Sequence, residues 1–203
     1  MSYNTTVQAA AQRPWLIYRE LFKDISWDDI YGSLKDLCKE YELPVGDKRY
    51  TAKRISCILK GDAKEVSVKS YSEYFSYHTM PTYDWSKCDM VHNIKLKLET
   101  IFKTNYDYCL CHIYRNGKDV IGWHNDKEAL ETDVVSVSFG ASRRFLLRKI
   151  DQTSGKCDGD YVLNHGDVVR MLVGCQKTHK HSVPAQAAVK EPRINLTFRK
   201  IEM

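Results

Sequence analysis

The feature that most constrains the fold is a change in residue pattern near Tyr106. From there onward, short runs rich in valine, isoleucine, phenylalanine and tyrosine alternate with glycine, asparagine and aspartate. β-Branched and aromatic residues favour strands, and the small polar residues mark turns. The runs that we predict to be strands are 108–114, 134–139, 145–150, 161–163, 168–173 and 194–199. Many short strands at this spacing predict a β-sandwich or a jelly roll.

Two amphipathic helices are predicted ahead of these strands. Ser26 is a typical N-cap, acidic residues follow it in the first turn, and apolar residues then recur up to Tyr41. A second apolar stripe at helical spacing extends from Met90 to Phe102 and ends near Lys103. Helices followed by strands indicate an α+β, β-rich domain in which the helices buttress one sheet.

Length and composition favour one soluble catalytic domain. The chain has 203 residues, of which 43% are apolar and 28% charged. No apolar run approaches the roughly 18 residues that a membrane span needs. The net charge of +5 is compatible with a polyanionic partner but decides nothing alone. We expect residues 1–13 to be a flexible tail and residues 14–203 to form a single domain, monomeric and without membrane association.

The cysteines indicate a reducing environment. All seven occur without a CxxC pair or the spacing of a secreted disulfide framework, and the N-terminus has no signal-peptide pattern. We therefore expect an intracellular protein, with nucleus and cytoplasm not distinguished. Cys109 and Cys111 lie near His112, but no second pair follows at the spacing of a tetrahedral zinc site. They are interpreted as small core residues.

Residues 43–85, between the predicted helices, form a candidate nucleotide-recognition lid. Lys53 and Arg54 belong to a basic group, and Tyr77 belongs to the dense aromatic group that follows. Phosphates bind cations and bases stack on aromatic rings, so this order suits a cover over a nucleotide. Edge strands whose aromatic residues pack on the core remain an equal alternative.

The pattern His-x-Asp occurs twice and is weak by itself. Asn164-His165-Gly166-Asp167 lies between two predicted strands and has the composition of a turn, so we interpret it as structural. His124-Asn125-Asp126 follows a short apolar run and opens into a charged loop, which suits a cavity mouth. Residues two apart on a strand share a face, so His124 and Asp126 can offer a nitrogen and an oxygen to one ion.

A third ligand would complete a site of two histidines and one carboxylate, which leaves coordination positions open for cosubstrate and O₂. The candidate is His181, in a short segment that also contains His179. The two histidines are two residues apart and would lie on the same face of a strand, so spacing alone leaves His179 as an alternative third ligand.

The segment Arg193-Ile194-Asn195-Leu196-Thr197-Phe198-Arg199 is the strongest motif. Its polar and apolar residues alternate strictly, so two guanidinium groups, an amide and a hydroxyl share one face of a strand. Guanidinium groups recognise carboxylates with two parallel hydrogen bonds, and a dicarboxylate needs a cation at each end. A basic edge strand selected for solubility is the alternative interpretation.

In this order, these residues resemble the AlkB family of oxidative nucleic-acid demethylases, particularly its eukaryotic DNA-repair branch. The resemblance covers roughly residues 106–201. Its motifs are Tyr114-Arg115-Asn116-Gly117, Ile121-Gly122-Trp123-His124-Asn125-Asp126, Val137-Ser138-Phe139-Gly140-Ala141-Ser142-Arg143-Arg144-Phe145, Leu163-Asn164-His165-Gly166-Asp167, His181-Ser182-Val183-Pro184 and Pro192-Arg193-Ile194-Asn195-Leu196-Thr197-Phe198-Arg199-Lys200.

The resemblance implies a double-stranded β-helix (jelly-roll) core over residues 106–201 and an iron site. It selects His124, Asp126 and His181 as the Fe(II) ligands, over His179 and the second His-x-Asp. It also implies 2-oxoglutarate as cosubstrate, with O₂ as the oxidant. The residues that would bind 2-oxoglutarate or shape its wall are Tyr114, Arg193, Asn195, Thr197 and Arg199, together with His112, which stands where the family usually has asparagine.

For the substrate, the resemblance is looser. It implies that Glu128 faces the target base, while Lys127 replaces an acidic residue that is common after the metal aspartate. Arg54, with Lys53, would contact phosphate, and Tyr77 falls within the lid.

The implied activity is removal of N-methyl lesions such as 1-methyladenine and 3-methylcytosine from DNA, or from RNA, with release of formaldehyde and succinate. Two alternatives stay open. One is a 2-oxoglutarate dioxygenase that acts on RNA modifications or protein side chains. The other is a non-catalytic nucleic-acid-binding module with the same fold.

Overall fold

The computed structural model describes residues 13–45, 48–61 and 80–200. The elements in chain order are β1 (Trp15–Tyr18), α1 (Trp27–Leu34), β2 (Glu42–Val45), β3 (Lys48–Thr51), β4 (Ile55–Lys60), β5 (Thr82–Asp84), η2 (Trp85–Lys87), α3 (Asp89–Phe102), β6 (Tyr108–Tyr114), β7 (Ile121–His124), η3 (Lys127–Ala129), β8 (Val134–Gly140), β9 (Arg143–Lys149), β10 (Gly159–Leu163), β11 (Val168–Met171), α4 (Cys175–Thr178), β12 (His179–Val183) and β13 (Arg193–Arg199). None of the helices within these ranges is long and apolar enough to cross a membrane.

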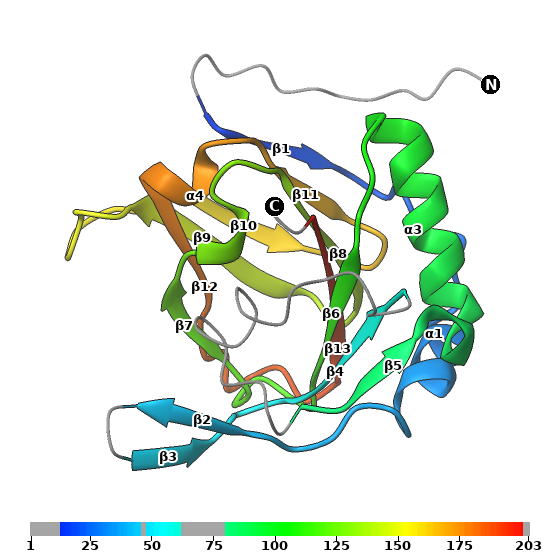
Figure 1. Ribbon diagram of the computed structural model, residues 1–203. Coiled ribbons are helices and arrows are strands. Elements are labelled where there is room, and N and C mark those ends of the chain that lie inside the picture. Colours follow the sequence, from blue (N-terminus) through cyan, green and yellow to red (C-terminus); the bar gives the residue numbers. More distant parts are fainter. Residues whose placement is uncertain (1–12, 46–47, 62–79, 201–203) are drawn as a thin grey trace.

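Two sheets form the body of the molecule (Figure 1). The larger has seven strands in the order β1-β11-β8-β13-β6-β4-β5, and the smaller has four in the order β10-β9-β12-β7. Among the described elements, strands β2 and β3 form a separate two-stranded hairpin that extends from the body at the lower left of Figure 1. The predicted β-rich α+β class, with the helices on one sheet, is confirmed.

The predicted strands after Tyr106 are all present, with ends that shift by at most a few residues. The larger sheet also recruits β1, β4 and β5 from the first half of the chain. Strand β4 lies between β6 and β5, so this part of the predicted lid segment is an interior strand of the sheet. Most of the predicted tail, and residues 46–47 and 62–79 of the lid, lie outside the described residues.

Helix α1 is shorter than its apolar pattern indicated. Ser26 caps it, and its Oγ accepts a hydrogen bond from the backbone N–H of Asp29, but the helix ends at Leu34. The chain then turns so that Lys39 exchanges two backbone hydrogen bonds with Ser56 of β4. Pairing with β4 replaces the last helical turn. Helix α3 matches its prediction, with Lys103 as the left-handed C-cap.

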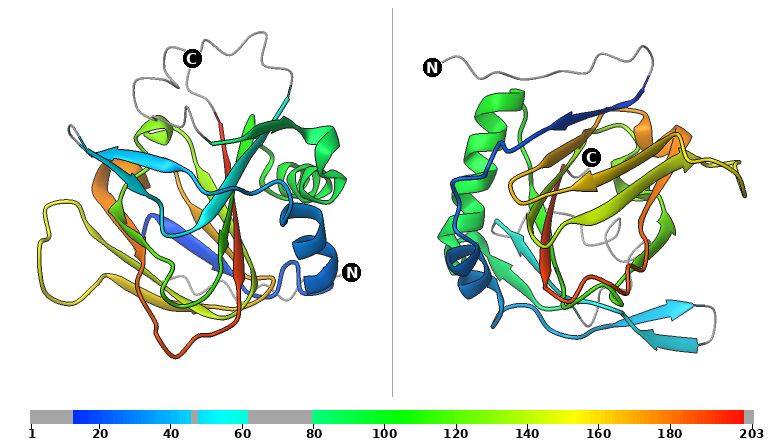
Figure 2. Two further views of the ribbon diagram at one scale, coloured as in Figure 1. Left: turned by 90° about the horizontal axis from the view of Figure 1, so that it is seen from below. Right: turned by 180° about the vertical axis from the view of Figure 1, so that it is seen from behind.

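The larger sheet separates an apolar layer from a polar one. On β13, Ile194, Leu196 and Phe198 pack in the core that includes the buried faces of α1 and α3. Figure 2 shows the ribbons of the two helices together on one side of the molecule. The alternate residues, from Arg193 to Arg199, face the opposite way, toward the smaller sheet. Because side chains alternate along a strand, one sheet supports the helices with one face and carries polar side chains on the other.

The turn between β10 and β11 supports the structural interpretation of His165-Gly166-Asp167. Gly166 has a φ of +82°, and a Cβ there would lie 2.5 Å from the backbone nitrogen of Lys23. The Asp167 carboxylate accepts hydrogen bonds from the backbone N–H groups of Glu20 and Asn164 and from the side chain of Arg19. Asp167 therefore ties the turn to the N-terminal segment.

Candidate metal centre

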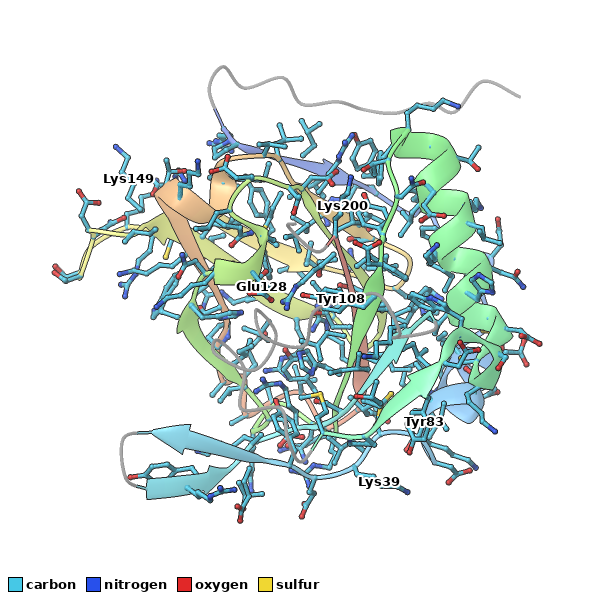
Figure 3. All side chains as sticks on the ribbon, viewed as in Figure 1. Lys39, Tyr83, Tyr108, Glu128, Lys149 and Lys200 are labelled. Carbon is cyan, nitrogen blue, oxygen red and sulfur yellow. The ribbon has the colours of Figure 1, made fainter. Side chains whose placement is uncertain are left out.

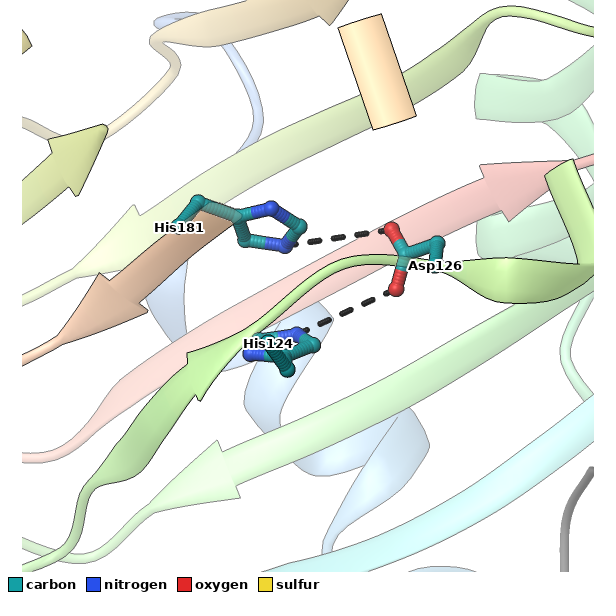
Figure 4. A group of neighbouring side chains, drawn as sticks. All are labelled: His124, Asp126 and His181. Atoms are coloured by element: carbon teal, nitrogen blue, oxygen red, sulfur yellow. Dashed lines mark ion pairs between the residues drawn. The ribbon is translucent and has the colours of Figure 1, made fainter. Parts of the chain in front are cut away.

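His124, Asp126 and His181 converge at one point between the two sheets (Figure 4). His124 is the last residue of β7, and it lies directly opposite His181 on β12 in the antiparallel register. Nε2 of each histidine lies 3.8 Å from a different oxygen of the Asp126 carboxylate, and the two imidazole centroids are 4.2 Å apart. Two nitrogens and one oxygen are thus arranged around a common space.

The ligand orientations are fixed by neighbouring groups. The carbonyl of Gly122 accepts a hydrogen bond of 2.8 Å from Nδ1 of His124, which leaves the Nε2 lone pair for a metal. The backbone N–H of Asp126 donates to Oε1 of Gln176 at 2.9 Å, and the side chain of Asn125 donates to the Gln176 carbonyl at 2.8 Å. Helix α4 therefore braces the loop that carries Asp126.

The charges of the three side chains suit a divalent cation. Loss of hydration lowers the pKa of His124, and burial together with the nearby His124 lowers the pKa of His181 to about 3. Both imidazoles are therefore neutral at neutral pH. Burial raises the pKa of Asp126, but the pKa is lowered overall, mainly because the positive charge of Arg199 lies next to the carboxylate. The cluster thus offers two lone pairs and one negative charge.

The competing histidines lie elsewhere. His179 packs edge-on against Trp15, with the ring centroids 5.1 Å apart, and its Nδ1 lies 2.8 Å from Oγ1 of Thr178. Nδ1 of His165 accepts a hydrogen bond from the backbone of Gly140. Among the described residues, His124, Asp126 and His181 are the one group of three or more His, Cys, Asp or Glu side chains close enough to share an ion.

A cavity of about 170 Å³ adjoins the three residues. Its walls come from both sheets. They include the predicted residues Arg54, His112, Tyr114, His124, Asp126, His181, Asn195, Thr197 and Arg199. Nδ2 of Asn195 donates to Oγ of Ser136 at 2.7 Å, and Oγ1 of Thr197 donates to Oδ1 of Asn195 at 3.4 Å. The polar face of β13 is thus a wall of this cavity.

Arg199 joins the metal cluster to Glu128. Its Nη2 lies 2.7 Å from Oδ1 of Asp126, and its Nη1 forms an ion pair with Oε1 of Glu128. The hydroxyl of Tyr108 donates to the same oxygen of Glu128 at 3.3 Å, and Figure 3 shows these two side chains near each other at the centre of the molecule. Burial raises the pKa of Glu128 to about 7, although Arg199 opposes the shift.

Arg193 is 1% exposed and is not among the residues that line this cavity, although its neighbour Tyr114 is. Its Nη2 donates to Oγ of Ser138 at 2.9 Å, and its guanidinium carbon lies 5.2 Å from the centre of the Tyr114 ring. Within the described ranges, Nε and Nη1 of Arg193 have no acceptor. Buried donors without partners are costly, so these two atoms fit a carboxylate supplied by a ligand. Burial also lowers the pKa of Arg193 to about 10, so the group stays charged.

The residues predicted to contact substrate differ in where the structure places them. Arg54 is 6% exposed, and its Nη1 donates to the carbonyl of Val120 at 3.3 Å, so it lies in the cavity wall instead of on the surface. Lys127 is exposed on η3, next to Glu128. Tyr77 lies outside the described residues.

Three polar residues to which the sequence analysis assigned no role take part in the site. Gln176 holds the backbone of Asp126, Ser138 bonds Arg193, and Ser56 contacts His112. The serines could have been found from strand parity, since each lies directly across from a polar residue of the motif strands. Gln176 has no such signal, because its position depends on how α4 packs.

The donor set fits a divalent iron ion. Two neutral imidazoles and one carboxylate are the ligand types of non-haem Fe(II) sites that keep coordination positions open. Oδ2 of Asp126 is buried, and no group in the described part of the chain donates a hydrogen bond to it. An ion between the three side chains would satisfy this oxygen.

Comparisons with known proteins agree with this geometry. The model of the 2OG-Fe(II) oxygenase superfamily matches residues 20–199. The chain is 28% identical to human alpha-ketoglutarate-dependent dioxygenase alkB homolog 3 over 201 residues, which cover 92% of this chain and 61% of that protein. It is 38% identical to the human DNA oxidative demethylase ALKBH2 over 105 residues, which cover 47% of this chain and 40% of that one.

The chain thus spans less than two thirds of the length of these relatives. Among solved structures, "The structure of OsALKBH1" superimposes with a TM-score of 0.59 at 18% identity, covering 94% of this chain and all of that one. This likeness shows the jelly-roll fold.

The superfamily uses Fe(II) and 2-oxoglutarate with O₂, and its model covers both strands of the metal cluster and the two-arginine strand. The chain belongs to the 2OG-Fe(II) oxygenase superfamily.

Proposed function

We propose that this protein is an oxidative demethylase that removes N-methyl lesions, such as 1-methyladenine and 3-methylcytosine, from DNA. The observation that carries the proposal is the juxtaposition of the metal cluster with a strand that has a buried arginine near each end. Similarity to proteins named as AlkB homologues supports the substrate class.

Different side chains of the site would bind the metal and the cosubstrate. His124, Asp126 and His181 would hold Fe(II). Arg193, with two N–H donors that lack an acceptor among the described residues, would bind one carboxylate of 2-oxoglutarate. Arg199, which is bonded to Asp126, would bind 2-oxoglutarate at the end nearest the metal. When bound, Fe(II) with O₂ and 2-oxoglutarate supplies the oxidation: one oxygen atom enters succinate as CO₂ leaves, and the other enters the methyl group, which departs as formaldehyde.

Glu128 would act on the base. One of its oxygens is held by Arg199 and Tyr108, while Oε2 is buried and, in the described part of the chain, has no hydrogen-bond donor. A free carboxylate oxygen beside the metal cluster can accept from an N–H group at the edge of an adenine or a cytosine. Glu128 would thereby orient the methylated face toward the iron.

The test is a coupled assay on matched oligonucleotides. Protein loaded anaerobically with Fe(II) and 2-oxoglutarate is exposed to O₂ with single- or double-stranded DNA, or RNA, that contains 1-methyladenine or 3-methylcytosine. We expect loss of the methyl mark with equimolar succinate and formaldehyde, and none with His181→Ala.

Other outcomes distinguish the alternatives. Demethylation of RNA alone would move the substrate to RNA. Succinate formation that no nucleic acid stimulates would contradict the repair function and favour a protein substrate. Oligonucleotide binding without Fe(II) binding would identify a non-catalytic binding module.

A further inference from the structure

His112 occupies the centre of a polar row across the larger sheet. It lies on β6, directly opposite Ser56 of β4 on one side and Asn195 of β13 on the other. The side chain is 3% exposed and lines the cavity beside the metal cluster. A histidine at this position can donate a hydrogen bond or accept one, depending on which ring nitrogen carries the proton.

The contacts of His112 determine its tautomer. Nδ1 lies 2.6 Å from Oγ of Ser56 and 3.4 Å from Nε of Arg54. A guanidinium group only donates, so Nδ1 must be the acceptor for the Arg54 contact to be favourable. The Ser56 hydroxyl then donates to the same nitrogen. The proton of the neutral ring is therefore on Nε2, because the other tautomer would set an N–H group against the N–H of Arg54.

The surroundings also keep this ring neutral. Burial is the main cause that lowers the pKa of His112 well below its usual value, and the positive charges of Arg54 and Arg199 add to it. A neutral histidine with an occupied Nδ1 has one donor left, the Nε2–H group. Since Nδ1 is turned toward Ser56 and Arg54, Nε2 is the nitrogen that remains for the cavity.

We propose that Ser56, assisted by Arg54, is a positioning residue that locks His112 as an Nε2–H donor to an oxygen of 2-oxoglutarate. This role rests on the proposed function. An asparagine at this position would carry an NH₂ donor in any environment, whereas a histidine is a donor there only in one tautomer. By holding His112 in the Nε2–H tautomer, Ser56 thus makes the histidine a constant hydrogen-bond donor, as an asparagine would be.

The test is a double-mutant cycle on 2-oxoglutarate binding by the full chain. The variants are Ser56→Ala, His112→Asn and the double variant, each titrated anaerobically with Fe(II) present. We expect Ser56→Ala to weaken binding by about tenfold in the His112 background, the size of one lost hydrogen bond to a charged group. In the His112→Asn background the same change should have no effect. Equal weakening in both backgrounds would show a merely structural role and overturn the proposal.

A second readout needs neither metal nor cosubstrate. Nitrogen-detected NMR of histidine-labelled protein should show the Nε2–H tautomer of His112 in the wild type and in Ser56→Thr, which keeps the hydroxyl, and a mixture in Ser56→Ala. A protonated Nδ1 in the wild type would overturn the proposal. Wild-type protein that binds no 2-oxoglutarate would contradict the proposed function and this role together. Normal wild-type binding with an unaffected Ser56→Ala variant would contradict this role alone.

Discussion

Nη2 of Arg199 lies 2.7 Å from Oδ1 of Asp126, so the end of β13 is bonded directly to a proposed iron ligand. The same guanidinium group holds Glu128. Arg199 therefore sets the position of a metal ligand and of a proposed base-binding carboxylate. The planar fork of arginine bonds each carboxylate with a separate nitrogen, whereas a lysine would have to reach both with a single ammonium group.

Replacement of Arg199 by lysine should lower Fe(II) affinity by about tenfold, the scale on which groups that orient metal ligands act. The positive charge stays, but one nitrogen replaces the two that bond Asp126 and Glu128, so the fixed geometry of both contacts is lost. Titration of the metal-free protein with Fe(II) under argon measures the effect. The matched control is Arg148→Lys, because Arg148 lies over the Trp123 ring and donates a hydrogen bond to the carbonyl of Thr153. Equal losses in both variants would argue against the bridging role.

His181 and His179 provide a matched pair for the metal site. They lie two residues apart on β12, but only His181 is in the cluster. His181→Ala should abolish Fe(II) binding, and His179→Ala should bind Fe(II) like the wild type. Metal content after dialysis, together with melting temperature, separates ligand loss from unfolding. Loss of metal in the His179 variant alone would exchange the two assignments.

Arg193→Met should weaken 2-oxoglutarate binding by about 100-fold and leave Fe(II) binding intact, because a paired charge-assisted bond is lost while the metal ligands are untouched. Isothermal titration with 2-oxoglutarate in the presence of Fe(II), without O₂, measures this. Unchanged 2-oxoglutarate affinity would mean that the two buried donors of Arg193 serve another group.

Asp167 should affect stability and not metal binding. Asp167→Ala removes the acceptor of three hydrogen bonds, two from the N-terminal segment and one within the β10–β11 turn, so we expect a loss of about 2–3 kcal/mol in the free energy of unfolding. Fe(II) affinity at a temperature where the variant is folded should match the wild type. Reduced affinity under those conditions would restore His165-x-Asp167 as a rival site.

The buried neutral His112 predicts a pH dependence of stability. Its folded pKa lies well below the unfolded value of about 6.5, so the unfolded chain binds the proton more readily. This contribution to stability is full above about pH 6.5 and falls by about 1.4 kcal/mol per unit as the pH drops below it. Urea unfolding of metal-free wild type and His112→Asn between pH 5 and 7 isolates it, since the variant lacks this slope. Parallel pH profiles would contradict the prediction.

The sequence predicted what alternation and turn chemistry determine. The polar face of Arg193–Arg199 and the turn at Gly166 follow from residue period and backbone geometry, and both are present. It could not predict that β4 enters the larger sheet, because that depends on pairing with β6, a distant segment. For the same reason the burial of Arg54 was missed, since nothing local distinguishes a phosphate-binding arginine from one in a cavity wall.

The third metal ligand shows the same limit. Spacing along the strand left His179 and His181 equivalent, the family resemblance selected His181, and the antiparallel register of β12 with β7 places His181 opposite His124. Register is a tertiary property that depends on both partner strands. The role of Gln176 likewise could not be predicted from the sequence, because it arises where α4 packs against the loop that carries Asp126.

Strand β7 is an edge strand of the smaller sheet, and among the described elements it pairs with β12 alone. Its last residue, His124, and its partner His181 would share the iron. An ion held by both strands acts as a cross-link at the place where the sheet has the fewest backbone bonds. Amide protons of residues 121–124 should therefore exchange more slowly with solvent when the site is filled, and iron occupancy would then govern how often this edge of the sheet opens.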